Sequence, residues 1–236
     1  MNDAVDLTVL YATHDALRRE LAHLDRLTTA ADRDPRQVLT TAAGWTLLKN
    51  ALHAHHTAED DALWPPLRRG LAGRPKDLAL LEVMEAEHAA ITPVIHAIDA
   101  ALADPGGGSL PLGQLTDALV RGLAGHLEHE EEAAFPLIRR ELTAGQWDRF
   151  SRVHAQRIDQ DALLLPWLLD GTDAPTAQRL LARLPPPAHA ACTGRWIPAY
   201  AVLDRWGADG AGSGGSAADA DGSTRHRPAP GRPPQE

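Results

Sequence analysis

Two stretches of the sequence repeat one pattern. HHTAEDDALWPPL begins at His55, HLEHEEEAAFPLI begins at His126, and the two align without a gap. Each places a histidine four residues before a glutamate and continues through acidic residues to an aromatic residue followed by proline. Residues four apart lie on nearly the same face of an α-helix. The chain is therefore interpreted as two copies of one helical unit, in which His55 and Glu59 correspond to His126 and Glu130.

The rest of the chain is also patterned for helices. Leu, Ala, Glu and Arg recur every three or four residues, whereas alternating runs of strand-forming residues are absent. The pattern predicts an all-α fold whose first four helices cover residues 7–30, 35–66, 75–103 and 111–136 and beyond. Short links join these helices, so we expect an up-down-up-down four-helix bundle.

Composition divides the chain into three regions. Residues 1–145 hold the predicted bundle, and residues 146–206 hold additional C-terminal helices that we expect to pack on it. Within this extension, QWDRFSRVHAQRIDQDALLLPWLL, APTAQRLLARL and TGRWIPAYAVLDRW each predict one helix, with Cys192 in a proline-rich connector. Residues 207–236 are rich in Gly, Ala, Ser, Asp and Pro and offer nothing to bury, which predicts a disordered tail.

The inward stripe of each bundle helix is apolar except at a few polar positions. In the first helix only His14 interrupts the stripe, and in the third only His88 does. The second and fourth helices turn their histidine–glutamate pairs toward the same interior. We expect the other histidines near these motifs to face solvent, and the isolated histidines to have no role in a site. The first set is His53, His56 and His129, and the second is His23, His96, His154 and His189.

Two carboxylates and four imidazoles would then converge inside the bundle. Removing each unpaired ion from water costs roughly several kcal/mol, so other charges have to compensate. A pair of metal ions does this, because imidazole nitrogens bind iron, manganese or zinc and a carboxylate can bridge two ions. Helical bundles commonly build dinuclear sites from inward side chains. The predicted metal ligands are His14, His55, Glu59, His88, His126 and Glu130.

These residues resemble the hemerythrin-like, or HHE cation-binding, family over residues 7–142. The resemblance rests on the paired HxxxE segments, each followed by acidic residues and an aromatic residue with proline. It implies a bundle holding a non-haem centre of two iron ions, with Glu59 and Glu130 as bridging carboxylates and the four histidines as terminal ligands. It further implies binding of O2 or a related small molecule such as NO or peroxide, or sensing of iron or redox state.

The sequence departs from the oxygen-carrying members of that family. They have a second histidine one turn before the third-helix ligand, where this chain has Met84. A thioether on an apolar stripe is typical core filler, so we expect a coordination sphere with one imidazole fewer. The carriers also use an acidic residue five positions after the fourth-helix histidine, whereas the internal repeat favours the fourth position. The sequence leaves open which further side chain completes the shell: His56, His129, Glu85 or Glu131.

Charge and cysteine content exclude several other functions. The net charge of -9 and pI near 5.7 disfavour binding to DNA or to an anionic membrane, which would repel the chain. One cysteine permits no intramolecular disulfide and no Cys-rich zinc module. The start of the chain does not resemble a secretory signal, and no long uncharged apolar stretch is present. We expect a cytoplasmic protein without nucleic-acid or membrane partners.

Two other interpretations fit the same bundle. A ferritin-like di-iron oxidase or peroxidase uses two ExxH motifs with two further glutamates. Here Glu85 and His88 supply one such motif, and the other half of the repeat supplies none. A metal-free helical adaptor would use its histidines for a pH response or for pairing with carboxylates. No GxSxG motif is present and we assign no catalytic residues, so binding or sensing is favoured over enzymatic activity.

Overall fold

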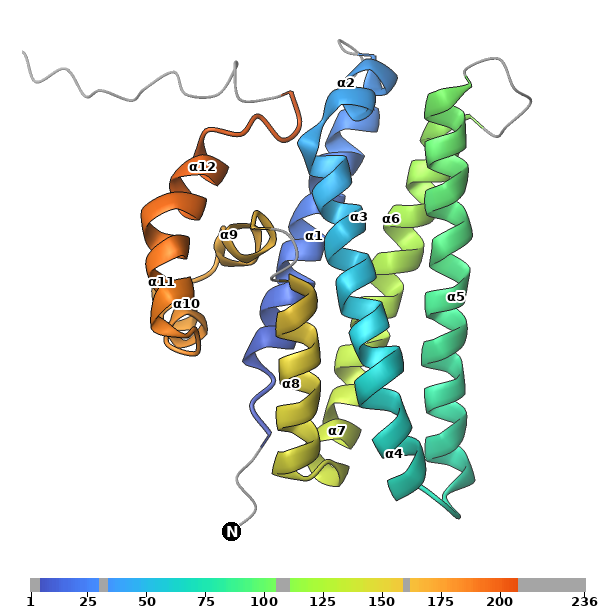
Figure 1. Cartoon of the computed structure of the whole chain (residues 1–236). Helices are drawn as coiled ribbons and strands as arrows, with labels where there is room; N and C mark the ends of the chain where they lie inside the picture. Colours follow the sequence, from blue (N-terminus) through green and yellow to red (C-terminus); the bar gives the residue numbers. More distant parts are fainter. Residues whose placement is uncertain (1–4, 30–33, 105–110, 159–161, 208–236) are drawn as a thin grey trace, which may run out of the picture.

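The four long helices form the predicted bundle. The computed structural model describes residues 5–29, 34–104, 111–158 and 162–207, and all regular structure among these residues is helical. This confirms the all-α fold and the up-down-up-down arrangement, since each long helix runs antiparallel to the one before it (Figure 1). The bundle helices are α1 (Thr8–Thr29), α3 (Ala43–Ala58), α5 (Pro75–Ala103) and α6 (Leu112–His129).

The bundle interior is apolar toward both ends and polar in between. One apolar cluster contains Leu17 and the following stripe residues of α1. The other contains Leu10 together with Trp64 and Phe135, which are completely buried. Each fully buried large side chain stabilises the fold by about 1.5–3 kcal/mol. His14 lies on α1 between Leu10 and Leu17, so apolar side chains cover the polar layer toward both ends of the bundle.

The prediction of a single second helix over residues 35–66 is wrong at two positions. A short helix, α2 (Pro35–Thr41), ends at Ala42, whose extended backbone (φ -70°, ψ 119°) turns the chain before α3 begins. At the other end the helical structure does not stop at Pro65 but continues as α4 (Trp64–Gly70). A proline in the first turn of a helix removes an N–H that would have no partner there, which is why the helix tolerates it.

A π-helical turn precedes that proline in both copies of the repeat. The turn η1 (Glu59–Leu63) joins α3 to α4, and η2 (Glu130–Ala134) joins α6 to α7 (Phe135–Glu141). In each turn the aromatic residue donates its N–H to the carbonyl of the glutamate five residues earlier. Single π-turns within α-helices are frequent at functional sites. The sequence repeat is thus also a repeat of backbone geometry.

The helices after the bundle pack against α1 and α3. Helix α8 (Ala144–Ile158) lies along α3 and η1, and α9 (Leu164–Leu169) contacts α1 and α3 (Figure 1). The segment 146–169, predicted as one helix, is therefore two, because Pro166 fits the first turn of a helix but not its interior. The chain continues as α10 (Ala174–Leu181), α11 (Pro186–Ala191), the π-turn η3 (Cys192–Trp196) and α12 (Ile197–Ala201).

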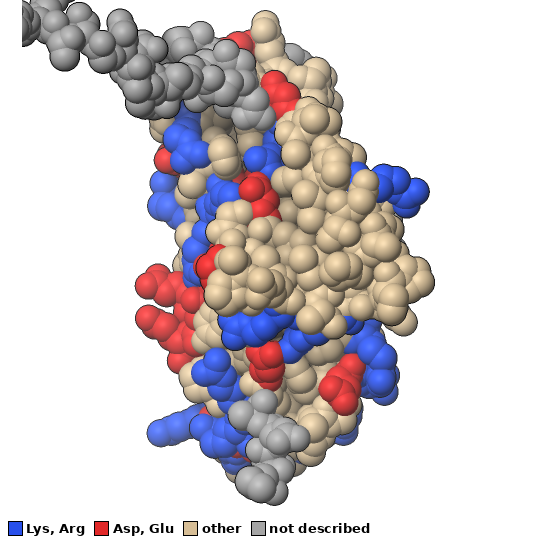
Figure 2. Space-filling view, turned by 90° about the vertical axis from the view of Figure 1, so that its left-hand side faces the viewer, with Lys and Arg blue, Asp and Glu red and all other residues tan. Residues whose placement is uncertain are grey.

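Cys192 is fully buried in a helical turn, not in the connector that the sequence predicts. Figure 2 shows the C-terminal helices from outside, with charged side chains surrounding a broad uncharged area. In the described part of the chain, no helix has both the length and the apolar character needed to cross a membrane. The predicted tail from residue 208 onward lies outside the described residues, and the division at 145 and 206 stays a prediction.

One tryptophan anchors the last described residues to the bundle. Trp206 is buried, and its indole Nε1–H donates to Glu20 Oε2 at 2.6 Å. Arg19 Nη2 pairs with the other oxygen of this buried carboxylate at 3.0 Å. Gly44 permits the close approach, because its N–H donates to the Arg205 carbonyl at 2.8 Å and a Cβ atom there would lie 2.7 Å from that oxygen.

Replacing Gly44 with alanine is expected to destabilise the protein by about 1–3 kcal/mol, the usual cost of overpacking. The added methyl group would collide with the Trp206 ring and the Arg205 carbonyl. Gly122→Ala in α6 is the matched control, because a Cβ atom there meets nothing within 4 Å. The free energy of unfolding in urea measures both effects. Equal stability of the Gly44→Ala variant and the wild type would show that the close packing of Trp206 contributes nothing.

Candidate metal centre

Two groups of potential metal ligands lie in the polar layer. In the first, His14, His55 and Glu130 are buried, and their ligand-type atoms all lie within 4.8 Å of one another. His14 Nε2 is 3.1 Å from His55 Nε2 and 3.1 Å from Glu130 Oε2. Helices α1 and α3 and the turn η2 each supply one of these residues, so the group exists only once the bundle has closed.

The second group consists of His56, His88 and His126, whose ligand-type atoms also lie within 4.8 Å of one another. The rings of His56 and His88 stack with their centroids 3.8 Å apart, and the ring of His126 meets His88 edge-on at 4.7 Å. Helices α3, α5 and α6 supply one histidine each. The consecutive residues His55 and His56 therefore belong to different groups.

Glu59 and Glu130 lie between the two groups. Glu59 Oε1 is 3.3 Å from His55 Nδ1, and its Oε2 is 3.6 Å from His88 Nε2. Glu130 Oε2 is 4.0 Å from His55 Nε2 and 4.0 Å from His126 Nε2. Each carboxylate thus faces a histidine of either group, which is the position that a bridging carboxylate needs.

Most inward-facing atoms of this layer have no hydrogen-bond partner. Buried polar atoms are almost always paired, and leaving one unpaired costs about 1–3 kcal/mol. Bound cations would supply the missing partners, and imidazole nitrogens with carboxylate oxygens fit iron, manganese or zinc. The eight unpaired atoms are His55 Nδ1, the Nε2 atoms of His56, His88 and His126, and both carboxylate oxygens of Glu59 and of Glu130.

Carboxylates outside the layer hold the opposite ring nitrogens of three histidines. Each Nδ1–H then donates to a carboxylate, which leaves the Nε2 lone pair free to face the interior. Carboxylates placed in this way orient the ligands of many metal sites. The contacts are His14 Nδ1 to Glu131 Oε1 at 2.8 Å, His88 Nδ1 to Asp60 Oδ1 at 3.0 Å, and His126 Nδ1 to Glu87 Oε2 at 2.9 Å.

Burial and neighbouring charges shift the ionisation of the layer. Burial, reinforced by the neighbouring imidazoles, lowers the pKa of His55 and of His56 well below its ordinary value. Burial beside Glu130 raises the pKa of Glu59 well above its ordinary value. Burial also acts to raise the pKa of Glu130, but the neighbouring imidazoles, that of His14 above all, outweigh it and lower that pKa. Neutral imidazoles, the form that binds metal ions, are thus favoured at His55 and His56.

The structure brings all six predicted ligands together in one buried layer. Their relative exposure does not exceed 5%, and four separate elements of the bundle carry the histidines. Their coordination of a metal stays a prediction. Two acidic residues at the edge of the layer, the exposed Asp60 and the partly exposed Glu131, orient His88 and His14. The internal repeat predicts Glu130, and not Glu131, as the acidic ligand on this helix. Glu130 is completely buried in the layer, whereas Glu131 lies outside it.

His56 corrects the prediction of a solvent-facing side chain. It is 7% exposed and belongs to the second group. A helix that faces two neighbours buries a stripe wider than one row, including positions i, i+3, i+4 and i+7. His56 lies four residues after the buried Leu52, so this wider stripe includes it. At the α5 position where the oxygen carriers have a second histidine, this chain has the fully buried Met84. The additional imidazole comes from His56 on α3 instead.

The remaining candidates lie outside the layer. His53 is exposed, as predicted. His129 is 39% exposed at its side chain, and its Nδ1 is 2.9 Å from Glu87 Oε1. Glu85 is exposed and forms an ion pair with Arg68 at 2.7 Å, so it does not turn inward. Glu87, which orients both His126 and His129, follows no pattern that marks it in the sequence.

His154 on α8 was assigned no role from the sequence, yet it lies against the layer. It is 1% exposed, and its ring meets that of His55 edge-on with the centroids 6.2 Å apart. Burial lowers its pKa to about 4. In the sequence it interrupts the apolar stripe of Trp147, Phe150 and Ile158, which is the same signal that identifies His14 and His88.

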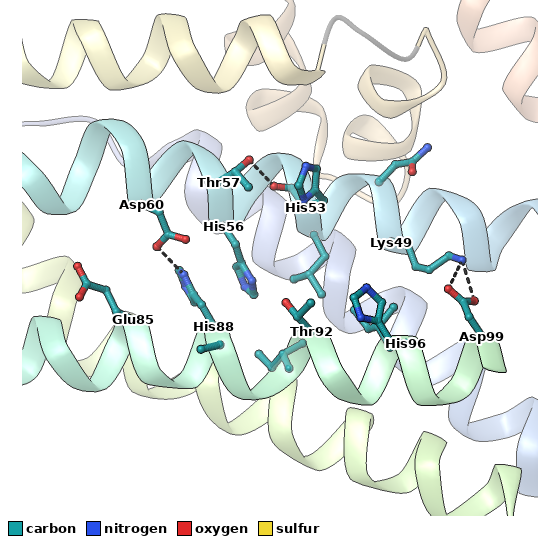
Figure 3. Close-up of a pocket in the computed structure, with 15 residues that line it drawn as sticks. Lys49, His53, His56, Thr57, Asp60, Glu85, His88, Thr92, His96 and Asp99 are labelled. Carbon is teal, nitrogen blue, oxygen red and sulfur yellow. Dashed lines mark hydrogen bonds and ion pairs between the residues drawn. The ribbon is translucent and has the colours of Figure 1, made fainter. Parts of the chain in front are cut away.

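A groove between α3 and α5 leads from solvent to the second group. Its volume is about 520 Å³, and His56 and His88 form part of its wall (Figure 3). Asp60 lies at one end beside His88, and the ion pair of Lys49 and Asp99, with an Nζ–Oδ1 distance of 2.8 Å, lies at the other (Figure 3). The groove is large enough for a small polar molecule to reach the layer.

Comparison with known proteins agrees with this geometry. A family model described as the hemerythrin HHE cation binding domain matches residues 5–138, which is more than half of the chain. The matched region contains both groups and the buried glutamates Glu59 and Glu130, and it ends before α8. No match was found among curated proteins or among solved structures.

Lowering the pH from 6.5 toward about 5 is expected to destabilise the metal-free protein. Five histidines have folded-state pKa values below the ordinary 6.5, so unfolding takes up protons in this range and the free energy of unfolding falls as the pH is lowered. His14 and Glu59, whose pKa values are raised, act in the opposite direction but are fewer. Urea unfolding across this range measures the effect, and constant stability would contradict it. The five groups are His23, His55, His56, His126 and His154.

Replacing Glu87 with glutamine is expected to weaken metal binding by about 10–100-fold, because a neutral amide neither fixes the tautomer of His126 nor raises its basicity. Glu82→Gln is the matched control, since Glu82 is exposed on the same helix. Competition with a chelator of known affinity, using zinc as the probe, measures both dissociation constants. Equal affinities in the two variants would show that Glu87 does not support the site.

Proposed function

Because the chain belongs to the hemerythrin HHE cation-binding family, we propose that its buried layer holds two iron ions and binds O2 or a related small molecule such as NO or peroxide. The observation that supports this most directly is the set of eight buried ligand-type atoms without partners. Non-haem iron supplies one-electron chemistry toward such molecules. The residues that would hold the ions are His14, His55, His56, His88 and His126, with Glu59 and Glu130 between them.

The protein's own groups prepare the layer for cations. Asp60, Glu87 and Glu131 hold the Nδ1 protons of three histidines, so these rings cannot rotate their Nε2 atoms away without losing a hydrogen bond. Burial beside Glu130 raises the pKa of Glu59, and a cation bound there would favour the carboxylate form.

The arrangement also sets how a small molecule reaches the layer. Trp64 and Phe135 belong to the apolar cluster that closes one end of the bundle. The groove along His56 and His88 remains open between α3 and α5 (Figure 3). We infer that O2, NO or peroxide enters through this groove and that the apolar layers limit other access of water.

Two observations favour this function over its rivals. The exposed Glu85 removes one of the glutamates that a ferritin-like oxidase would need beside His88. A metal-free adaptor would leave the unpaired atoms uncompensated, at a cost of about 1–3 kcal/mol for each. We further propose that the protein works in the cytoplasm without a nucleic-acid or membrane partner, because the chain is acidic and its one cysteine is unpaired.

Anaerobic titration with Fe(II) tests the proposal. We expect about two ions per chain and, after exposure to air, a charge-transfer absorption band. His56→Ala should lose tight binding of one ion, whereas its neighbour His53→Ala should not, because His53 is exposed. Glu59→Gln should bind the second ion weakly, since one bridging oxygen is replaced. Wild-type protein that binds no iron would overturn the function, and equal behaviour of the two histidine variants would overturn the role of His56.

A further inference from the structure

An apolar pocket of about 270 Å³ lies where α8, α9 and α10 meet α1, and all of its lining residues except Val9 lie outside the family-matched region. Its wall consists mainly of aliphatic side chains, and among the residues that the structure describes no carboxylate lines it. Pockets of this kind, apolar with a few polar groups, are typical of small-molecule sites. The aliphatic residues are Val9, Ile158, Leu165, Leu168, Leu180 and Leu184.

One buried polar side chain completes this wall. His154 lines the pocket, is 1% exposed, and its Nε2 atom has no hydrogen-bond partner. An unpaired imidazole nitrogen in apolar surroundings is costly, and a ligand in the pocket could supply the partner. The same ring meets His55 edge-on, so the pocket and the candidate metal centre share this side chain.

The charges that line the pocket are positive. Arg183 forms an ion pair with Asp6. Arg152 is exposed and forms no ion pair with any residue that the structure describes. A guanidinium is suited to bind a carboxylate through two parallel hydrogen bonds. In a chain with a net charge of -9, a free arginine beside an apolar pocket is complementary to an organic acid.

We propose that this pocket binds a small carboxylic acid with an apolar body, its carboxylate at Arg152 and at the unpaired Nε2 atom of His154, and its body against the aliphatic wall. The volume corresponds to roughly nine groups the size of a water molecule, at about 30 Å³ each. A short aliphatic chain such as that of octanoate fills such a space. Contact between His154 and His55 links the bound acid to the metal layer, and this link alone rests on the proposed function.

Calorimetric titration of the metal-free, full-length protein with octanoate tests the pocket. Arg152→Gln should weaken binding about fivefold, which corresponds to about 1 kcal/mol. Arg149→Gln is the matched control, because Arg149 is exposed on the same helix but does not line the pocket. Ala155→Trp should fill the pocket and abolish binding. No binding by the wild type, or equal affinity in Arg152→Gln and Arg149→Gln, would overturn the proposal.

Protein loaded with Co(II) tests the link to the metal layer. Octanoate should shift the visible absorption of the bound ion in the wild type but not in His154→Leu. Octanoate binding without a spectral shift in the wild type would overturn the role of His154. Failure to bind Co(II) would instead count against the metal site, and the titration of metal-free protein with octanoate would still decide the pocket.

Discussion

The burial of polar ligand-type side chains between two apolar layers is the constraint on which the rest of this structure depends. Seven such residues, from α1, α3, α5, α6 and the two π-turns, are at most 7% exposed to solvent. Their cost would oppose folding unless opposite charges compensate it. Carboxylates outside the layer accept hydrogen bonds from the outward-facing ring nitrogens of three histidines, and the inward-facing atoms are left to bind cations. The seven residues are His14, His55, His56, Glu59, His88, His126 and Glu130.

The two copies of the repeat depend on each other. Asp60, which follows Glu59, holds the ring of His88 in the second copy. Glu131, which follows Glu130, holds the ring of His14 in the first copy. In each copy, the histidine on the first helix is therefore oriented by a carboxylate of the other copy. The symmetry breaks at His56, because the aligned position in the second copy is the fully buried Leu127.

The C-terminal extension is more than a support for the bundle. Helix α8 places His154 against His55, and the pocket on its other side is lined by residues of α1, α8, α9 and α10. Trp206 then anchors the end of the extension to Glu20 on α1. The region that the family match does not cover thus contacts the same helices that carry the candidate ligands.

The sequence by itself determined the helical class, the paired units and the inward direction of six polar side chains, because these follow from periods of three and four residues within single helices. Only the tertiary structure decided the break at Ala42, the burial of His56 and the contacts of Glu87 and His154. Each of these depends on a neighbouring helix. Trp206 packs over Gly44, and α5 lies beside His56. Helical periodicity records which face of a helix is buried, but not which partner covers its edges.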